Sequence, residues 1–279
     1  MRKRLLVRLL VFFVVLLAAD IAVQIGRHWV TRHAPATADW MTIGAALVLA
    51  AALVGLYAAL VRWMEHRAAH ELAPRAIQAV AGIILGVALF SIVFELLHLI
   101  GVVRWQGLTG HFDVTMLSVS ILAGVGEELA FRGALFRIVE EGFGTTSALV
   151  TSAVVFGLLH GLNPGATIVS TTAIAIEAGI LLAAAYALTR NLWFPIGLHF
   201  GWNFTEGGIF GVSVSGGPTG KGIFSVALTG HRLLTGGSFG PEASVVAIAV
   251  CLAAGVVLLV LTVRRGHWMS MQPAGATAR

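Results

Sequence analysis

The chain has 279 residues and a formal net charge of +5, and it is 58% hydrophobic and only 11% charged. Soluble domains carry about 25% charged residues, and a mean hydropathy of +0.91 is incompatible with a surface that faces water throughout. The composition therefore excludes a soluble globular protein. The apolar runs are long rather than short and alternating, which also excludes a membrane β-barrel. We expect an all-α, polytopic membrane protein.

Eight apolar segments approach the roughly 20 residues that a membrane-spanning helix needs. In chain order they are residues 5–26, 41–63, 76–100, 114–136, 147–162, 166–188, 192–210 and 243–263. The fifth and seventh are short and have Gly and Pro nearby, so we expect them to be tilted or broken. The first begins with basic residues, as a signal peptide does, but its apolar character continues past Asp20. We therefore expect an uncleaved first span.

The basic residues predict the orientation of these spans. With the N-terminus inside, thirteen Lys and Arg residues fall on or near the inner side and five fall outside. This asymmetry predicts that both termini are cytoplasmic. We expect an integral, multi-pass protein, with the bacterial cytoplasmic membrane as its location. The asymmetry also explains the net positive charge, so we expect the lipid bilayer and no nucleic acid as a partner. The Gly-, Ser- and Thr-rich segment 211–241 is predicted to be a flexible outer loop.

Eight ionisable residues lie at membrane depth, where each costs at least ~2.5–3.5 kcal/mol and is a functional candidate by default. They are Glu95, Glu127, Glu128, Glu177, Glu206, His98, His160 and His199. No paired intramembrane aspartates are present, because the only Asp residues are Asp20, Asp39 and Asp113. The lone cysteine, Cys251, cannot form an intrachain disulfide. The carboxylates and histidines therefore carry any chemistry within the membrane.

The stretch GEELAFRG, residues 126–133, holds two of these carboxylates. Glu128 and Arg132 are spaced i,i+4 and can pair on one helix face. Glu127 points about 100° away and has no local cation, so it suits the role of a general base. The alternative is a structural ion-pair cluster that determines helix register.

Two later spans add polar side chains at helical spacing. Phe156 and His160 are spaced i,i+4 in the fifth span, and His199 and Asn203 are spaced i,i+4 in the seventh. A carboxylate can take a proton from water, and a histidine can orient that water or protonate a leaving amine. A His/Asn pair can stabilise an oxyanion. Glu127, His160 and His199 are equally a candidate set of zinc ligands, and both schemes remain open.

Structural rather than catalytic roles are expected for the remaining ionisable residues. Glu95 and His98 are spaced i,i+3 near the outer end of the third span and are expected to pair with each other. Glu177 is expected to hydrogen-bond a Ser or Thr of a neighbouring helix. Glu206 lies near the end of its span and is expected to be solvated.

The three motifs together resemble the CAAX-protease and bacteriocin-processing family of intramembrane endopeptidases, also called the abortive-infection family. That family has a Glu-Glu-x-x-x-Arg motif, then Phe-x-x-x-His, then His-x-x-x-Asn. This chain has EELAFR at 127–132, FGLLH at 156–160 and HFGWN at 199–203, in order and each in an apolar span.

The resemblance implies about eight transmembrane helices around an intramembrane catalytic cavity, and hydrolysis of peptide bonds in membrane-associated substrates. It implies that Glu127 and His160 activate water, and that His199 and Asn203 form an oxyanion hole or bind a divalent metal such as zinc. Glu128, Arg132 and Phe156 match supporting positions. The expected organisation is N-terminal helices at 1–113, a catalytic core at 114–210, and a loop, last helix and tail at 211–279.

Two other functions compete with a peptidase. Buried Glu and His can relay protons in an ion-coupled transporter, although no matching half-repeats are visible. A non-catalytic immunity protein could keep the same fold. The substrate and the oligomeric state are not encoded in any recognisable motif.

Overall fold

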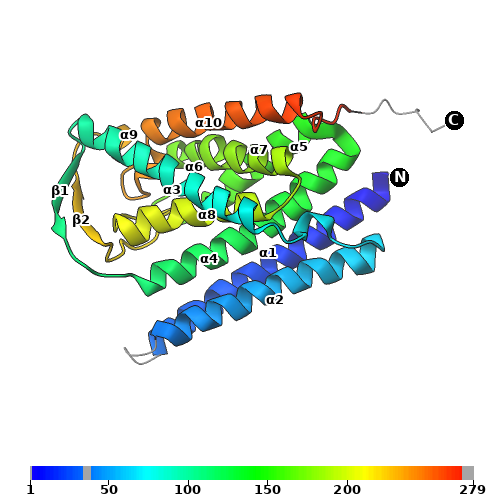
Figure 1. Ribbon diagram of the computed structural model, residues 1–279, viewed down its shortest axis with the longest axis horizontal. Helices are drawn as coiled ribbons and strands as arrows, with labels where there is room; N and C mark the ends of the chain where they lie inside the picture. Colours follow the sequence, from blue (N-terminus) through cyan, green and yellow to red (C-terminus); the bar gives the residue numbers. More distant parts are fainter. Residues whose placement is uncertain (1, 34–38, 272–279) are drawn as a thin grey trace.

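The computed structural model describes residues 2–33 and 39–271, and most of it is helical (Figure 1). The first half contains α1 (Arg2–His33), α2 (Asp39–Glu65), η1 (His70–Leu72), α3 (Ala76–Leu99), strand β1 (Val103–Leu108), α4 (Val114–Glu128) and η2 (Leu129–Phe136). The second half contains α5 (Arg137–His160), α6 (Ile168–Ile174), η3 (Ala175–Gly179), α7 (Ile180–Thr189), α8 (Trp193–Asn203), η4 (Phe204–Ile209), β2 (Phe224–Leu228), α9 (Arg232–Thr235), η5 (Pro241–Ala243) and α10 (Val245–Arg264). The all-α, polytopic fold class is confirmed.

The predicted number of eight membrane crossings is not confirmed. Each of the eight predicted segments is helical, but only six helices in the described ranges are long and apolar enough to cross a membrane. One of these, Val114–His160, has 47 residues and contains both the fourth and the fifth predicted segments. It is not straight, because Gly144 has a φ of 80° and bends the chain. The seventh segment, α8 with η4, is too short by this criterion, so the count of eight is not confirmed.

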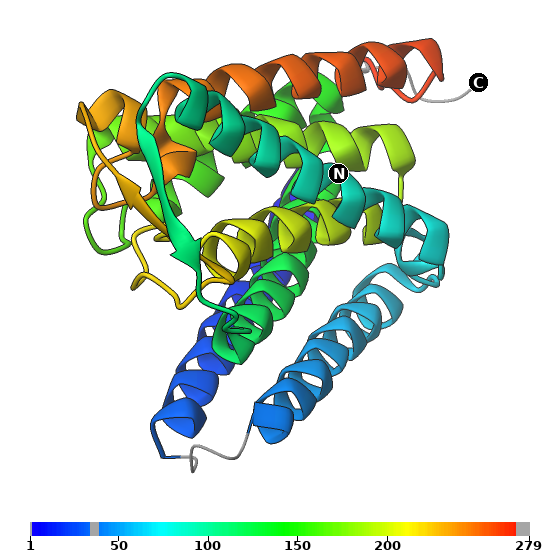
Figure 2. The same cartoon turned by 60° about the vertical axis from the view of Figure 1, so that its left-hand side comes forward.

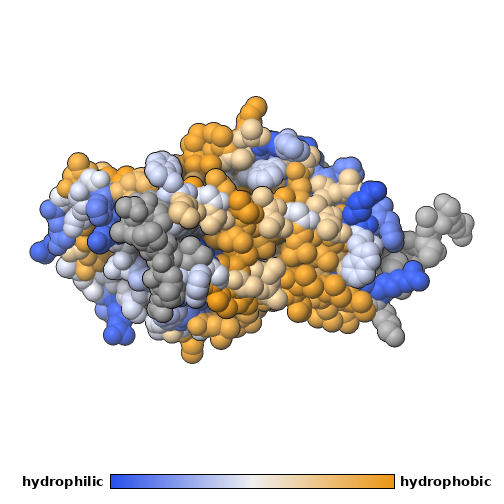
Figure 3. Space-filling view, turned by 90° about the horizontal axis from the view of Figure 1, so that it is seen from below, coloured by the Kyte–Doolittle hydropathy of each residue, from blue (hydrophilic) through white to orange (hydrophobic). Residues whose placement is uncertain are grey.

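A broad apolar belt crosses the middle of the face shown in Figure 3. Hydrophilic residues gather at the two ends of the same view, and large apolar side chains are exposed along α1, α2, α3 and α10. Water would penalise such a surface, whereas lipid tails do not. This arrangement is that of an integral membrane protein.

The two ends of the molecule are built differently. The start of α1 and the end of α10 lie at one end, and a two-stranded antiparallel sheet of β1 and β2 lies at the other (Figure 1). The segment 211–241, which was predicted to be a flexible loop, contains the short strand β2 and the short helix α9. Phe210 explains part of the order, since its ring stacks on Phe94 with centroids 3.9 Å apart. Trp105 of β1 packs on both Phe94 and Phe224 and joins the sheet to α3.

Helices α3 and α8 cross in direct backbone contact. A Cβ atom on Gly82 or Gly86 of α3 would lie 2.2 Å from a carbonyl oxygen of α8, and one on Gly197 of α8 would lie 2.2 Å from the carbonyl oxygen of Ala79. Both helices therefore present Gly-x-x-x-Gly faces, which allow close packing where hydrophobic burial offers little driving force. The crossing determines where α8 lies in the bundle.

A network of ion pairs closes the end that holds the termini. Arg137 donates to Glu65 at 2.8 and 3.0 Å, to Glu141 at 2.9 Å and to the Gly133 carbonyl at 2.8 Å. Arg67 contributes a second cation by donating to both Glu71 oxygens, at 2.8 and 2.9 Å. Arg137 Nε also lies 3.4 Å from Glu71 Oε1, so this network connects α2, η1 and α5. In Figure 2, α1 and α2 project from the rest of the bundle, with α4 beside them.

Candidate active site

The predicted catalytic residues come from three helices and end up together. Glu127 and Glu128 are the last two residues of α4, and His160 is the last residue of α5. His199 lies in α8, and Asn203 is the last residue of that helix. Because α8 is held against α3 and packs on α4 and α7, its histidine reaches the carboxylates of α4.

Glu127 faces both histidines through one oxygen. Its Oε2 lies 3.9 Å from His160 Nε2 and 4.0 Å from His199 Nε2. That oxygen is buried and has no hydrogen-bond partner. Separations of this size exceed a direct hydrogen bond but suit one bridging water molecule. Glu127 is thus oriented toward His160 and His199 rather than toward a neighbouring cation.

Hydrogen bonding determines which nitrogen of His160 faces the site. His160 Nδ1 lies 2.9 Å from the Phe156 carbonyl oxygen. A carbonyl only accepts, so Nδ1 carries the hydrogen and donates it. In the neutral ring Nε2 is then an acceptor that points toward Glu127. Two acceptors therefore face each other, and a molecule with two O–H groups can donate to both.

Glu128 joins His199 to Arg132. Its Oε1 lies 3.0 Å from His199 Nδ1 and 2.9 Å from Arg132 Nη1, and neither Glu128 nor Arg132 is exposed. The expected i,i+4 ion pair is therefore present. Because the carboxylate accepts from Nδ1, Nε2 of His199 is the atom that faces Glu127. Arg132 also lies over the Phe156 ring, with its guanidinium carbon 4.7 Å from the ring centroid.

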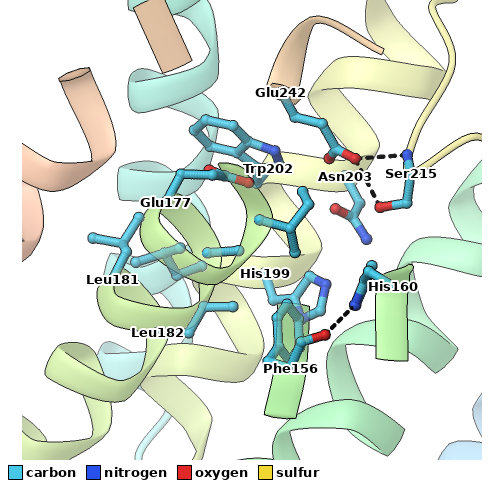
Figure 4. A pocket seen from close by; sticks show the side chains of 13 residues that line it. Phe156, His160, Glu177, Leu181, Leu182, His199, Trp202, Asn203, Ser215 and Glu242 are labelled. Atoms are coloured by element: carbon cyan, nitrogen blue, oxygen red, sulfur yellow. Dashed lines mark hydrogen bonds between the residues drawn. The ribbon is translucent and has the colours of Figure 1, made fainter. Parts of the chain in front are cut away.

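A narrow pocket with a cavity volume of about 20 Å³ lies beside these residues (Figure 4). His160, His199 and Asn203 contribute polar groups to one part of it, and Trp202 and Phe156 contribute aromatic walls. Asn203 is 7% exposed. The pocket therefore offers donors and acceptors next to an apolar wall, as ligand sites in proteins do.

The donor atoms at the site have the types that zinc accepts, but their spacing is too wide for it. Two histidine nitrogens and one carboxylate oxygen are donors that zinc accepts, and ligands of a tetrahedral zinc lie about 3.4 Å apart. The distances of 3.9 and 4.0 Å from Glu127 Oε2 are longer. Among the described residues, no three His, Cys, Asp or Glu side chains are grouped closely enough to hold a metal ion. The donor types fit zinc but their spacing does not.

Asp20 is a site residue that the sequence analysis missed. It lies on α1 at 6% exposure, and a Cβ on Gly126 would lie 2.0 Å from its Oδ1. A buried carboxylate of the N-terminal helix therefore touches the residue before Glu127. The only signal in the sequence was an aspartate inside the first apolar segment.

Glu242 and Ser215 are also pocket residues that the sequence analysis missed. Ser215 lies in the segment interpreted as a loop, and Glu242 lies between that segment and the last predicted span. The Ser215 N–H and Oγ–H donate to Glu242 Oε1 at 2.7 and 2.8 Å (Figure 4). No spacing rule relates residues 27 apart, so only the tertiary structure reveals this pair.

Three expectations for other ionisable residues were wrong. Glu206 is fully buried instead of solvated, because η4 and η5 enclose it and its Oε1 accepts from the Glu242 N–H at 3.3 Å. Glu177 is 1% exposed, and its Oε1 has no hydrogen-bond partner, although a Ser or Thr partner was expected. His98 Nδ1 lies 3.1 Å from the Val103 carbonyl oxygen. The His98 side chain is therefore anchored to β1 and not paired with Glu95.

Fold and site together define a polytopic helical membrane protein with a carboxylate–histidine site buried among its helices. Residues 109–205 match the family model described as "Type II CAAX prenyl endopeptidase Rce1-like". This match covers all three motifs, and it confirms the resemblance to the CAAX-protease family over that part of the chain. No curated protein and no solved structure matches the chain.

Proposed function

We propose that the protein is an intramembrane endopeptidase that hydrolyses peptide bonds with a water molecule activated by Glu127. The observation that carries this proposal is the buried, unpartnered Oε2 of Glu127, which lies 3.9 and 4.0 Å from two histidine nitrogens. A carboxylate desolvated in this way is a good general base. The match to an endopeptidase family supports the same reaction class.

In the proposed reaction, a water molecule donates one hydrogen bond to Glu127 and another to Nε2 of neutral His160. Its oxygen attacks the carbonyl carbon of the substrate, and its proton passes to Glu127. The tetrahedral intermediate then breaks at the C–N bond. The proton returns from Glu127, with the help of His160, to the leaving nitrogen, so the products are a carboxylic acid and an amine.

His199 and Asn203 stabilise the oxyanion in this scheme. Glu128 accepts the Nδ1 hydrogen of His199, at 3.0 Å, and keeps Nε2 directed at the site. When His199 is protonated, Nε2–H is a donor, and the Asn203 amide is a second donor in the same pocket. Two preorganised donors in a site of low dielectric stabilise developing negative charge strongly.

The substrate is a peptide or protein segment at the membrane. The pocket has apolar walls and lies within a molecule that has an apolar belt, so the substrate reaches it from the bilayer or its interface. The family description names prenylated CAAX substrates, and we extend only the peptide class to this chain. Paired prenylated and unmodified peptides measure whether a prenyl group is required.

The proposal is tested with Glu127→Gln in detergent or lipid nanodiscs. The amide cannot take a proton, so we expect kcat to fall by about 10²–10⁴-fold while thermal stability is kept. Peptide cleavage is measured by mass spectrometry, with Glu95→Gln on the exposed face of α3 as the matched control. Full-rate cleavage by Glu127→Gln contradicts the proposal. Proton flux into liposomes without cleavage favours the transporter instead.

Chelator treatment of the same sample measures whether cleavage needs a metal ion. We expect a chelator to leave cleavage unchanged, because the described histidines and carboxylates are not spaced as a metal site. Loss of activity with a chelator and its return with Zn²⁺ reject the metal-free scheme. Elemental analysis of the purified protein gives a second readout.

A further inference from the structure

Strand β2 has a free edge at the end of the molecule that lies away from the termini. In the described part of the chain the sheet has two strands, so each strand is paired on one side only (Figure 1). The outer edge of β1 is partly covered, because His98 Nδ1 lies 3.1 Å from the Val103 carbonyl oxygen. The outer edge of β2 borders a cleft instead. An unpaired row of N–H and C=O groups is a template for another extended chain.

The pairing at the two ends of β2 determines which of its backbone groups point outward. Thr229 N–H donates to the Val102 carbonyl at 2.8 Å, and Thr109 N–H donates to the Ile223 carbonyl at 2.9 Å. Residues of an antiparallel strand alternate between hydrogen-bonded and non-bonded pairs. Every second residue counted back from Thr229 therefore faces β1, and the others direct their N–H and C=O groups outward. The outward residues are Phe224, Val226 and Leu228.

A cleft with a volume of about 550 Å³ lies along this edge. The three outward residues line it, and so does Ser225, whose side chain lies on the opposite face of the strand. Residues from both faces meet in one cleft when that cleft follows the edge of the strand. All five residues of β2 are half-buried, so the edge is accessible. The volume is within the range of about 300–1,000 Å³ that ligand sites have.

The cleft and the active-site pocket share a wall. Ser213 and Gly240 line the cleft, whereas Ser215 and Glu242, slightly further along the same two segments, line the pocket. The segments are joined to each other, because Ser213 Oγ–H donates to the Phe239 carbonyl at 3.2 Å. A chain that lies in the cleft is therefore next to the groups that act on the peptide bond in the proposed reaction.

Helix η4 gives the separation between the cleft and the site. It begins directly after Asn203 and ends just before Phe210, which lines the cleft. Helical residues rise about 1.5 Å each, so this stretch spans about 10 Å. An extended chain covers the same distance with about three residues, at about 3.3 Å each.

We infer that the free edge of β2 binds the substrate as an added β-strand, which begins about three residues from the cleaved bond. The occupant is a peptide in extended conformation, because the edge leaves main-chain N–H and C=O groups unpaired at the spacing of a strand. Main-chain hydrogen bonds supply the affinity in this mode of recognition, so the bound segment is selected for being unfolded more than for its side chains. The inference rests on the proposed peptidase function.

A proline in β2 tests the added strand. Val226→Pro removes one outward N–H and keeps the hydrogen bonds to β1. We expect KM for a cleaved peptide to rise about three- to tenfold, with kcat kept, because one main-chain hydrogen bond is lost away from the reacting atoms. Leu108→Pro is the matched control, since Leu108 is opposite Phe224 and its N–H points outward from the edge of β1. Equal KM values for the two variants overturn the added strand.

A scan of the substrate tests the same contact with the protein unchanged. Single N-methyl groups are placed on successive residues of the peptide. We expect KM to rise at every second position on one side of the cleaved bond, beginning about three residues away, because alternate N–H groups of an added strand face β2. Uniform tolerance of N-methylation in that region overturns the inference.

A binding measurement separates the added strand from the proposed function. The probe is a fluorescein-labelled peptide, Thr-Val-Thr-Val-Thr-Lys, and its control is the same peptide with alternate residues N-methylated. Fluorescence anisotropy is measured with the Glu127→Gln variant. We expect the control to bind about tenfold more weakly, and Val226→Pro to reduce the difference. Equal binding of the two peptides overturns the strand site, whereas a Val226-dependent difference without cleavage of any peptide supports that site and rejects only the peptidase.

Discussion

Glu128 and Arg132 form the most deeply buried ion pair of the site. Each ion loses its hydration in the bundle, and their contact at 2.9 Å offsets that loss only while both are present. His199 depends on the same carboxylate oxygen, at 3.0 Å. One residue therefore neutralises a buried cation and orients a proposed catalytic histidine.

Removal of Glu128 tests this double role. Glu128→Ala leaves Arg132 buried and unpaired, and we expect it to cost ~3–5 kcal/mol of unfolding free energy. Denaturant titration in detergent measures the change. Glu95→Ala removes a carboxylate from an exposed position and serves as the control. A loss no greater than that of Glu95→Ala contradicts the assignment of a buried pair.

At the scale of elements, three π-helical turns adjoin the site. η2 follows Glu128 directly, η3 contains Glu177, and η4 follows Asn203 directly. A π turn widens the helix and changes the direction of the side chains after it. Buried polar residues within these turns, such as Arg132 in η2 and Glu206 in η4, are thereby directed differently from the residues of a regular helix.

The crossing of α3 and α8 is the element on which His199 and Asn203 depend. A Cβ on Gly201 would lie 2.4 Å from the Ile83 carbonyl oxygen, so Gly201→Ala moves α8 away from α3. A misplacement of about 1 Å can cost about 100-fold in rate. We expect a loss of that size in kcat/KM, measured on the peptide substrate.

Gly55→Ala is the matched control for this helix crossing. Gly55 lies in α2, and no atom lies within 4 Å of the position that its Cβ would take. The same substitution there keeps full activity. Equal activity of Gly201→Ala and Gly55→Ala refutes the dependence of the site on close packing.

At the scale of the whole molecule, the ion pairs around Glu65, Glu71 and Arg137 join the ends of neighbouring helices to one another. Glu71 accepts from Tyr57 at 2.5 Å and from both Nη atoms of Arg67. Burial favours the neutral form of Glu71, but hydrogen bonds from Arg67 and Tyr57 and the charge of Arg137 outweigh it. They lower the pKa of Glu71 below its ordinary value.

This lowered pKa predicts a dependence of stability on pH. The contribution of Glu71 is complete above the ordinary glutamate value and is lost as pH falls through the lower folded value. We expect Glu71→Gln to cost ~1–3 kcal/mol near neutral pH, and the difference from wild type to shrink with acidification. Unfolding in detergent as a function of pH measures both. A difference that grows in acid contradicts the assignment.

Orientation in the bilayer is also a property of the whole molecule. In a Cys251→Ser background, a cysteine is placed at exposed Arg4 or at exposed Thr219. A membrane-impermeant maleimide is expected to label Thr219→Cys in intact cells, and Arg4→Cys only after permeabilisation, because basic residues remain inside. The reverse pattern refutes the predicted cytoplasmic termini.

Local regularities in the sequence predicted the parts of this protein that depend on neighbours along the chain. Hydropathy indicated the membrane class, and helical spacing predicted the Glu128–Arg132 pair, because residues i and i+4 meet on any helix. The three motifs indicated the family that residues 109–205 match. These features are determined before the helices pack.

Contacts between distant segments were decided only by the tertiary structure. Packing brought Glu127 Oε2 close to two histidines and placed Asp20 against Gly126. Packing also buried Glu206, which was expected from the sequence to be solvated. It also directed Glu242, from the last part of the chain, into the same pocket as His160. No periodicity relates such residues, because their positions depend on how α3, α8 and the π turns pack. The membrane class and the motif residues therefore follow from the sequence by itself, whereas the orientation of each charged group follows from the packing of helices in space.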